Sequence, residues 1–223
     1  MDINVILFGA TGMIGQGVLI ECLAHPAVKS VLVIGRRSCG VRHEKLQEIM
    51  HNDFLDYTAI EDRLAGYNAC FFCLGISSMG MTEEAYHRIT HDYAVQAASV
   101  LAAHNPAMIF CYISGAGADA TEQSRTMWAR VKGKAENALK AFPFKNVYLM
   151  RPAFVHPEKG VTPSYKLYKV LGPLFPLLRF LFPAYVTTTA EVGQALINAV
   201  LYGSEKQTLE NRDMVELARR TWS

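Results

Sequence analysis

The chain has 223 residues, of which 51% are hydrophobic and 19% charged, a balance typical of a globular protein with one substantial core. Its 22 basic and 20 acidic residues give a formal charge of +2 and are scattered along the sequence, which excludes a basic stripe for nucleic acid. We therefore expect a single domain over residues 1–223 that has no nucleic-acid partner.

Short apolar runs alternate with longer segments of helical periodicity. The runs predict strands near residues 3–8, 30–35, 46–51, 69–74, 108–113 and 146–150, and the periodic segments predict helices at residues 13–24, 83–104 and 122–141. This alternation is typical of a parallel sheet covered by helices on both faces. Right-handed crossovers then give a doubly wound, Rossmann-type α/β fold, in which residues 152–223 form a small region that covers the substrate.

The cysteines favour a reducing compartment. There are five of them without a framework spacing, and the amino terminus enters a strand pattern with no leader, so we expect a cytoplasmic protein. Cys70 and Cys73 form a CxxC inside the apolar run 69–74, where an odd separation points them to opposite faces of the sheet. We expect core residues, with redox or metal chemistry as the alternative.

Three glycines follow the first predicted strand directly. Gly9 would allow a tight turn, Gly12 would let the backbone approach a pyrophosphate, and Gly15 would let the next helix pack close to the strand. Free amides at the positive end of that helix would face the anion. We expect dinucleotide contacts from Gly9, Thr11, Gly12, Met13, Ile14 and Gly15. The alternative is a glycine-rich turn without a ligand.

The end of the second strand predicts which dinucleotide is bound. A carboxylate there would hold the ribose hydroxyls of NAD, but the sequence has Arg36 and Arg37, whose guanidinium groups pair with phosphate. We favour NADP over NAD, with two solvated loop charges as the alternative. Further along, Asp53 and Phe54 are placed to bound the adenine, and the backbone at Leu74 and Gly75 to approach the ribose and phosphates.

Residues 167–185 are strongly apolar but are interrupted by a glycine, three prolines and an arginine. Prolines this dense disfavour a membrane span, although peripheral membrane contact stays open. The segment could be a lid over the substrate, an oligomer surface or plain core. A helix at residues 190–201 and a short strand and helix within residues 207–220 complete the predicted elements.

Several motifs resemble the short-chain dehydrogenase/reductase superfamily. They are the glycine turn, the Ser-Gly-Ala-Gly-Ala-Asp segment at residues 114–119 and the Val-Lys-Gly-Lys-Ala-Glu segment at residues 131–136. Together with residues 151–155 and 188–193, they look like the atypical members, which include the HIV Tat-interacting oxidoreductase-like and the NAD-dependent epimerase/dehydratase-like proteins. The likeness covers nearly the whole chain.

This resemblance implies a catalytic set that the chain matches only in part. In the superfamily a Tyr hydroxyl exchanges a proton with the substrate carbonyl, a Lys four residues later holds the nicotinamide ribose, and a Ser orients the carbonyl. Here Lys132 stands at the Lys position and Ser114 at or beside the Ser position, but Trp128 replaces the Tyr, and an indole N–H is not a usable acid or base. Arg151 and Pro152 are implied to contact the cofactor.

Two other sequence patterns are alternative candidates for a functional site. Tyr165 and Lys169 also satisfy YxxxK but follow the sixth strand, so they are in the wrong segment, although Tyr165 or Tyr168 could enter the pocket and supply a phenol. His87 and His91 are spaced i, i+4 with no third ligand evident, and a solvated helix face is favoured over a metal site.

Two main hypotheses remain for the function. The first is an NADP(H)-dependent oxidoreductase acting on a small carbonyl compound with a substitute or solvent proton source. The second is a non-catalytic NADP(H)-binding redox sensor that reports to a partner through residues 167–185. A membrane-associated redox accessory protein is a weaker third. The superfamily resemblance allows a monomer or a homodimer formed through the helices at residues 83–104 and 122–141.

Overall fold

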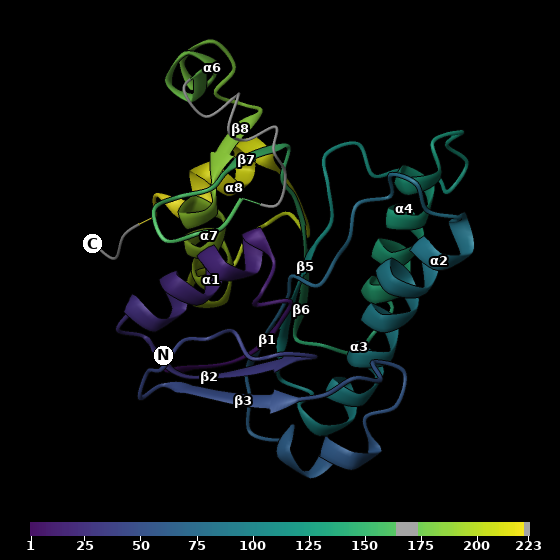
Figure 1. Ribbon diagram of the computed structural model, residues 1–223, viewed down its shortest axis with the longest axis vertical. Coiled ribbons are helices and arrows are strands. Elements are labelled where there is room, and N and C mark those ends of the chain that lie inside the picture. Colours follow the sequence, from purple (N-terminus) through teal and green to yellow (C-terminus); the bar gives the residue numbers. More distant parts are fainter. Residues whose placement is uncertain (164–173, 221–223) are drawn as a thin grey trace.

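A computed structural model describes residues 1–163 and 174–220 and has a parallel seven-stranded sheet at its centre (Figure 1). The strand order is β3-β2-β1-β4-β5-β6-β9, which is the predicted Rossmann order with one strand added at the edge. The strands are β1 (Ile3–Phe8), β2 (Val28–Gly35), β3 (Leu46–Met50), β4 (Ala69–Phe72), β5 (Ile109–Ile113), β6 (Asn146–Arg151) and β9 (Thr208–Glu210). All pairs are parallel.

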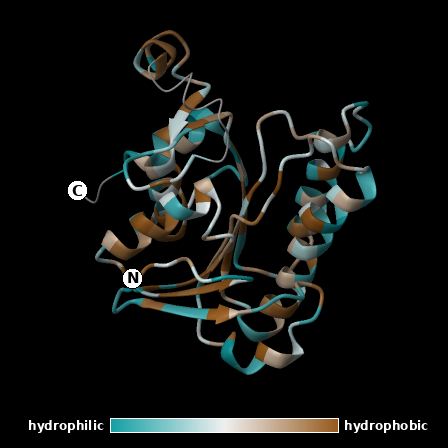
Figure 2. Cartoon of the chain, in the orientation of Figure 1, coloured by the Kyte–Doolittle hydropathy of each residue, from teal (hydrophilic) through white to brown (hydrophobic). Residues whose placement is uncertain are grey.

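Helices cover both faces of the sheet, as the doubly wound prediction requires. One face packs on α1 (Met13–Ala24), α7 (Thr189–Tyr202) and α8 (Asn211–Ala218). The other packs on α3 (Tyr93–His104), α4 (Met127–Lys140) and the 3-10 helix η1 (Thr58–Arg63). Figure 2 shows the strands between them as predominantly hydrophobic, because both faces of a parallel sheet are buried.

Two predicted helices differ from the expectation. The helix predicted from residue 122 begins at Met127, because the carboxylate of Asp119 accepts hydrogen bonds from the amides of Thr121, Gln123 and Ser124. Residues 83–104 are helical throughout but consist of α2 (Glu83–His87), a π turn (Arg88–Asp92, η2) and α3.

The carboxyl-terminal third contains a second, two-stranded sheet that the sequence did not predict. It pairs β7 (Phe154–His156) with β8 (Val186–Thr188) in parallel. The described part of the apolar segment forms α6 (Phe175–Leu181), which has no buried residue, so the plain-core interpretation is contradicted there. Arg179 of α6 forms an ion pair with Glu191 of α7, and Figure 1 shows α6 at the periphery.

Helix α1 approaches α7 closely at Gly17. A Cβ added at Gly17 would lie 2.4 Å from Thr189 Cβ, a distance at which one of the two helices must move. The absence of a side chain at residue 17 therefore sets the separation of the helices on this face of the sheet.

We expect Gly17→Ala to lower the free energy of unfolding by about 1–3 kcal/mol, because overpacking outweighs the gain of helix propensity. Urea denaturation followed by circular dichroism would measure it. Gly75→Ala is the matched control, because a Cβ there would meet no atom within 4 Å. Unchanged stability of the Gly17 variant would contradict the close packing.

Candidate functional site

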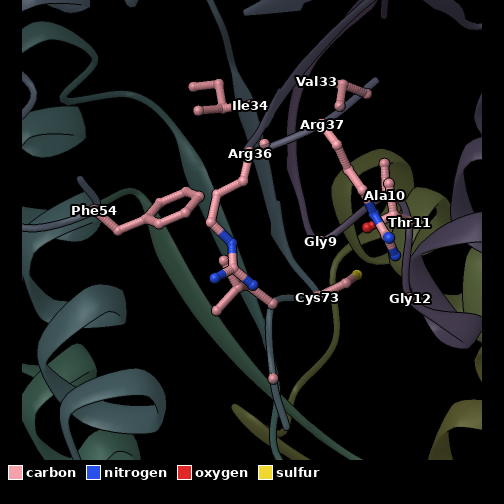
Figure 3. Close-up of a pocket in the computed structure, with 13 residues that line it drawn as sticks. Gly9, Ala10, Thr11, Gly12, Val33, Ile34, Arg36, Arg37, Phe54 and Cys73 are labelled. Atoms are coloured by element: carbon pink, nitrogen blue, oxygen red, sulfur yellow. The ribbon is translucent and has the colours of Figure 1, made fainter. Parts of the chain in front are cut away.

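A cavity of about 520 Å³ lies at the carboxyl ends of β1, β2 and β4 (Figure 3). This is where the strand order reverses, the position at which doubly wound sheets bind ligands. Its walls come from three segments that the sequence analysis singled out: Gly9 to Gly12, Gly35 to Arg37, and Cys73 to Gly75, with Phe54 at one side. The structure therefore brings most of the predicted cofactor residues together.

The glycine turn has the geometry that a phosphate cradle requires. Gly9 has φ of 79°, and a Cβ there would lie 2.6 Å from the carbonyl carbon of Cys73. A Cβ at Gly15 would lie 2.0 Å from the Gly9 oxygen, so α1 starts directly against the turn. A Cβ at Gly12 would lie 3.4 Å from its nearest atom, so packing within the protein does not require a glycine here. The backbone of Gly12 lines the cavity. The turn fits an anion at the amino end of α1.

Arg36 and Arg37 line the same cavity with exposed side chains. In Figure 3, Arg36 extends on the side of Phe54 and Arg37 toward Thr11 and Gly12. Within residues 1–163 and 174–220, neither guanidinium has a hydrogen bond or an ion pair. A nearby carboxylate, Glu48, accepts bonds from the Ser38 hydroxyl at 2.8 Å and the Cys39 amide at 2.7 Å. These bonds engage both Glu48 oxygens away from the cavity.

Asp53 and Phe54, in the loop after β3, have different positions. Phe54 is 2% exposed, packs edge-on against Phe8 and forms part of the cavity wall. Asp53 is exposed and does not line the cavity; its Oδ1 accepts a hydrogen bond from the Leu55 amide at 3.0 Å. Of these two residues, Phe54 lines the cavity and Asp53 does not.

A second cavity of about 430 Å³ adjoins the first, since Gly12, Cys73, Leu74 and Gly75 line both. Ser114, Trp128 and Lys132 lie together on its wall, as the i, i+4 spacing of the last two predicts. Met13, Ile14 and Pro152 also line it. Ser114 is 8% exposed and its hydroxyl has no partner within the described chain. A buried hydroxyl without a partner beside a cavity suggests a ligand as the missing partner.

The ammonium group of Lys132 is buried beneath this cavity. Its Nζ donates to the Ile113 carbonyl at 2.9 Å and to the Tyr112 hydroxyl at 3.2 Å, which accounts for two of its three donors. Burial lowers the pKa of Lys132 to about 8, and the charge of Glu136 acts in the opposite direction. Such a pKa is suited to a group that gives or takes a proton near neutral pH.

The indole of Trp128 packs against the loop that follows β5. A Cβ at Gly117, which has φ of 90°, would lie 3.3 Å from the indole, and one at Gly115 would lie 3.8 Å from it. The indole therefore lies over the loop after β5, where a side chain at residue 117 would crowd it and one at residue 115 would begin in ordinary contact with it. Gly133 fixes α4 in this position, because a Cβ there would lie 1.7 Å from the Asp119 carbonyl oxygen.

Some predicted residues lie elsewhere. Arg151 lines neither cavity; it bonds to the buried Glu136, at 2.9 and 2.5 Å, and to Glu210 at 3.0 Å, so its guanidinium joins α4 to β6 and β9. Tyr165, Tyr168 and Lys169 lie outside the described residues. Cys70 and Cys73 pack on opposite faces of the sheet, as predicted, and burial raises the pKa of both thiols, which disfavours thiolate chemistry.

The sequence analysis missed Tyr86 of α2. This side chain is 3% exposed and lines the second cavity with Ser114 and Lys132. Its electrostatic interaction with the Tyr112 hydroxyl acts with burial, the larger cause, to raise the pKa of Tyr112. Nothing in the local sequence marks Tyr86, because its place at the cavity depends on how α2 packs against α4.

Comparison with known proteins shows which proteins the chain resembles. The chain is 26% identical over 210 residues to protein fmp52, mitochondrial, of Emericella nidulans, covering 89% of this chain and 87% of that one. It is 26% identical over 152 residues to protein HTATIP2 of Rattus norvegicus, covering 67% and 61%. These matches bear out the resemblance to the atypical short-chain dehydrogenase/reductase group that the sequence motifs indicated. Its fold matches MoeE5 in complex with UDP-glucose and NAD, with a TM-score of 0.68 and 15% identity over 96% of this chain and 80% of that one. No protein-family model matches the chain.

The comparisons correct one prediction. The fmp52 relatives are named as mitochondrial proteins, which points away from the purely cytoplasmic location predicted from the sequence, and that prediction is contradicted. Unpaired cysteines indicate a reducing environment and do not by themselves specify a compartment. Among the helices of residues 1–163 and 174–220, none is long and apolar enough to cross a membrane.

The lowered pKa of Lys132 predicts a pH dependence of stability. Between about pH 8 and the ordinary lysine value of 10.5, the unfolded chain binds a proton that the folded chain lacks, so the free energy of unfolding rises with pH in this window. We expect the parent to gain roughly 3 kcal/mol relative to Lys132→Met between these limits. Denaturation at several pH values would measure the difference, and a flat difference would contradict a buried ammonium.

Proposed function

We propose that the chain is an NADP(H)-dependent oxidoreductase that acts on a small carbonyl compound. The observation that carries the proposal is the pair of adjoining cavities, one with a phosphate-binding turn and two arginines, the other with a buried serine and lysine. A dinucleotide that spans both would have its phosphates at the glycine turn and its nicotinamide beside Ser114 and Lys132.

The first cavity supports NADP over NAD. Amides of the turn and of the first residues of α1, including Met13 and Ile14, would hold the pyrophosphate. Arg36 and Arg37 would hold the 2′-phosphate, because both are available and the nearby Glu48 carboxylate is engaged by the loop after β2. Phe54 would lie against the adenine, and the backbone at Leu74 and Gly75 would approach the ribose.

We expect NADPH to bind at least about tenfold more tightly than NADH, and Arg36→Ala with Arg37→Ala to remove most of this preference, since a charge-assisted hydrogen bond contributes about 1.5–3 kcal/mol. Calorimetric titration of parent and variant with both dinucleotides would test it. Arg42→Ala is the control, because Arg42 is an exposed arginine of the same loop outside the cavity. If neither dinucleotide binds at millimolar concentration, the proposal fails.

The second cavity supports chemistry on a carbonyl group. Bound NADPH would supply the hydride. The Ser114 hydroxyl would hold the carbonyl oxygen, and Lys132, with its pKa of about 8, would be a proton source in place of the missing phenol, with the Tyr86 hydroxyl on the same wall as a second ionisable group. Pro152, Ala153 and Val155 extend this wall, so residues 152–223 would contribute the substrate side of a single nucleotide-binding domain.

One observation favours a second function, a non-catalytic NADP(H)-binding sensor. Trp128 stands at the position of the family's catalytic Tyr and is packed over the loop at residues 115–117. An indole there can donate a hydrogen bond but cannot exchange a proton with a substrate. A chain that kept the cofactor site and lost the acid could report cofactor state to a partner.

Trp128→Tyr distinguishes the two functions. If the cavity is otherwise assembled for reduction, the new phenol, four residues before Lys132, should raise NADPH oxidation in the presence of a panel of small aldehydes and ketones by about tenfold or more. Trp128→Phe is the matched control, because it removes the indole without adding a hydroxyl. No gain in the Tyr variant, with NADPH still bound, would favour the sensor.

A further inference from the structure

The helical run at residues 83–104 carries a cluster of metal-ligating side chains outside both cavities. His87 Nδ1 and His91 Nδ1 lie 3.1 and 2.8 Å from Asp92 Oδ1, and the two imidazole rings stack with their centroids 4.3 Å apart. One ligand atom from each residue lies within 4.8 Å of the other two. Two nitrogen ligand atoms and one oxygen ligand atom therefore lie within 4.8 Å of one another on the surface of the helix.

The π turn is what assembles this cluster. In an α-helix each residue advances by about 100° around the axis, which places residue i+5 on a different side from residue i. The wider i→i+5 turn over Arg88–Asp92 brings Asp92 back toward the face of His87, while His87 and His91 are already neighbours at i, i+4. A sequence interpretation that assumes a continuous α-helix therefore finds two ligands and misses the third.

The donor set matches a borderline divalent cation. Zinc accepts imidazole nitrogen and carboxylate oxygen at about 2.0–2.2 Å in tetrahedral geometry, so that neighbouring ligand atoms lie about 3.3 Å apart. The separations of 2.8 and 3.1 Å need only small changes to reach that value. The three side chains are 31%, 22% and 40% exposed, which gives a solvent molecule access as a fourth ligand.

The surrounding charges set a limit on the affinity. Glu83 and Lys134 both interact electrostatically with His87, one favouring and the other opposing a cation. Glu83 is also bonded to Arg130 through both carboxylate oxygens, at 3.1 and 2.6 Å. The site has three protein ligands, and the charges around it do not sum to a negative charge. We therefore expect it to bind a divalent cation with micromolar affinity, more weakly than a fully enclosed structural site.

We propose that His87, His91 and Asp92 bind one divalent transition-metal ion, with zinc as the best match. The ion would fix the π turn and with it the start of the helical run, where Tyr86, the residue before His87, lines the second cavity. This proposal is independent of the proposed nucleotide chemistry, because none of its three ligands lines either cavity.

The test is a titration of the full, tag-free chain, treated with chelator and then dialysed, with Zn²⁺ by calorimetry and with Co²⁺ by visible absorption. We expect one ion per chain with Kd of about 1–10 μM, and a rise of the melting temperature with added Zn²⁺. His91→Ala and Asp92→Asn should each weaken binding by more than about tenfold.

Two variants separate a metal site from a hydrogen-bonded surface cluster. Asp92→Asn keeps an oxygen that accepts hydrogen bonds from the imidazoles, so a hydrogen-bonded cluster would survive while the metal site is lost. His104→Ala removes another histidine of the same helical run, whose Nε2 lies 2.8 Å from Glu61, and should bind Zn²⁺ as the parent does. The proposal is overturned if the parent binds no Zn²⁺ at about 1 mM. It is also overturned if Asp92→Asn binds Zn²⁺ as tightly as the parent does.

Discussion

The close contact between the turn after β1 and the start of α1 is the constraint on which the site depends. Gly9 can adopt its left-handed conformation and pass the end of β4 only without a side chain, and Gly15 lets the helix begin directly against the Gly9 carbonyl. These contacts fix the amino end of α1 at the point where the strand order reverses. The amino end of the helix, the positive end of its dipole, is thereby aimed into the cavity by backbone geometry.

Much of the fold could be predicted from the sequence because its strands are buried on both faces. The runs in β1, β4 and β5 are almost wholly apolar and only four to six residues long, which favours strands buried on both faces. The two-stranded sheet of β7 and β8 was missed because three-residue strands that pair only with each other have no distinctive periodicity. The start of α4 was misplaced because the Asp119 carboxylate accepts hydrogen bonds from the amides of the turn before the helix, a local side-chain contact that apolar periodicity does not reveal.

The candidate site also contains residues that the sequence predicts and residues that it does not. Most predicted residues of the glycine turn and of the ends of β2 and β4 line one cavity, because parallel topology brings the carboxyl ends of neighbouring strands together. Arg151 could not be assigned from sequence, since its bonds to Glu136 and Glu210 join three elements far apart in the chain. Tyr86 and Asp92 were missed for a related reason: one depends on helix packing and the other on a π turn, and neither leaves a mark in local periodicity.

The structure around Trp128 accommodates its indole ring. Gly115 and Gly117 leave room for the indole, while Gly133 brings α4 against the Asp119 carbonyl and so determines how far Trp128 and Lys132 reach over the loop. The ammonium group of Lys132 is buried and donates hydrogen bonds to the Ile113 carbonyl and the Tyr112 hydroxyl. Its burial lowers its pKa. Burying an ammonium group costs stability, and the hydrogen bonds to Ile113 and Tyr112 offset part of that cost. The buried lysine and the Ser114 hydroxyl, which has no partner within the described residues, are thus two polar groups on one cavity wall, where a molecule in that cavity would meet both.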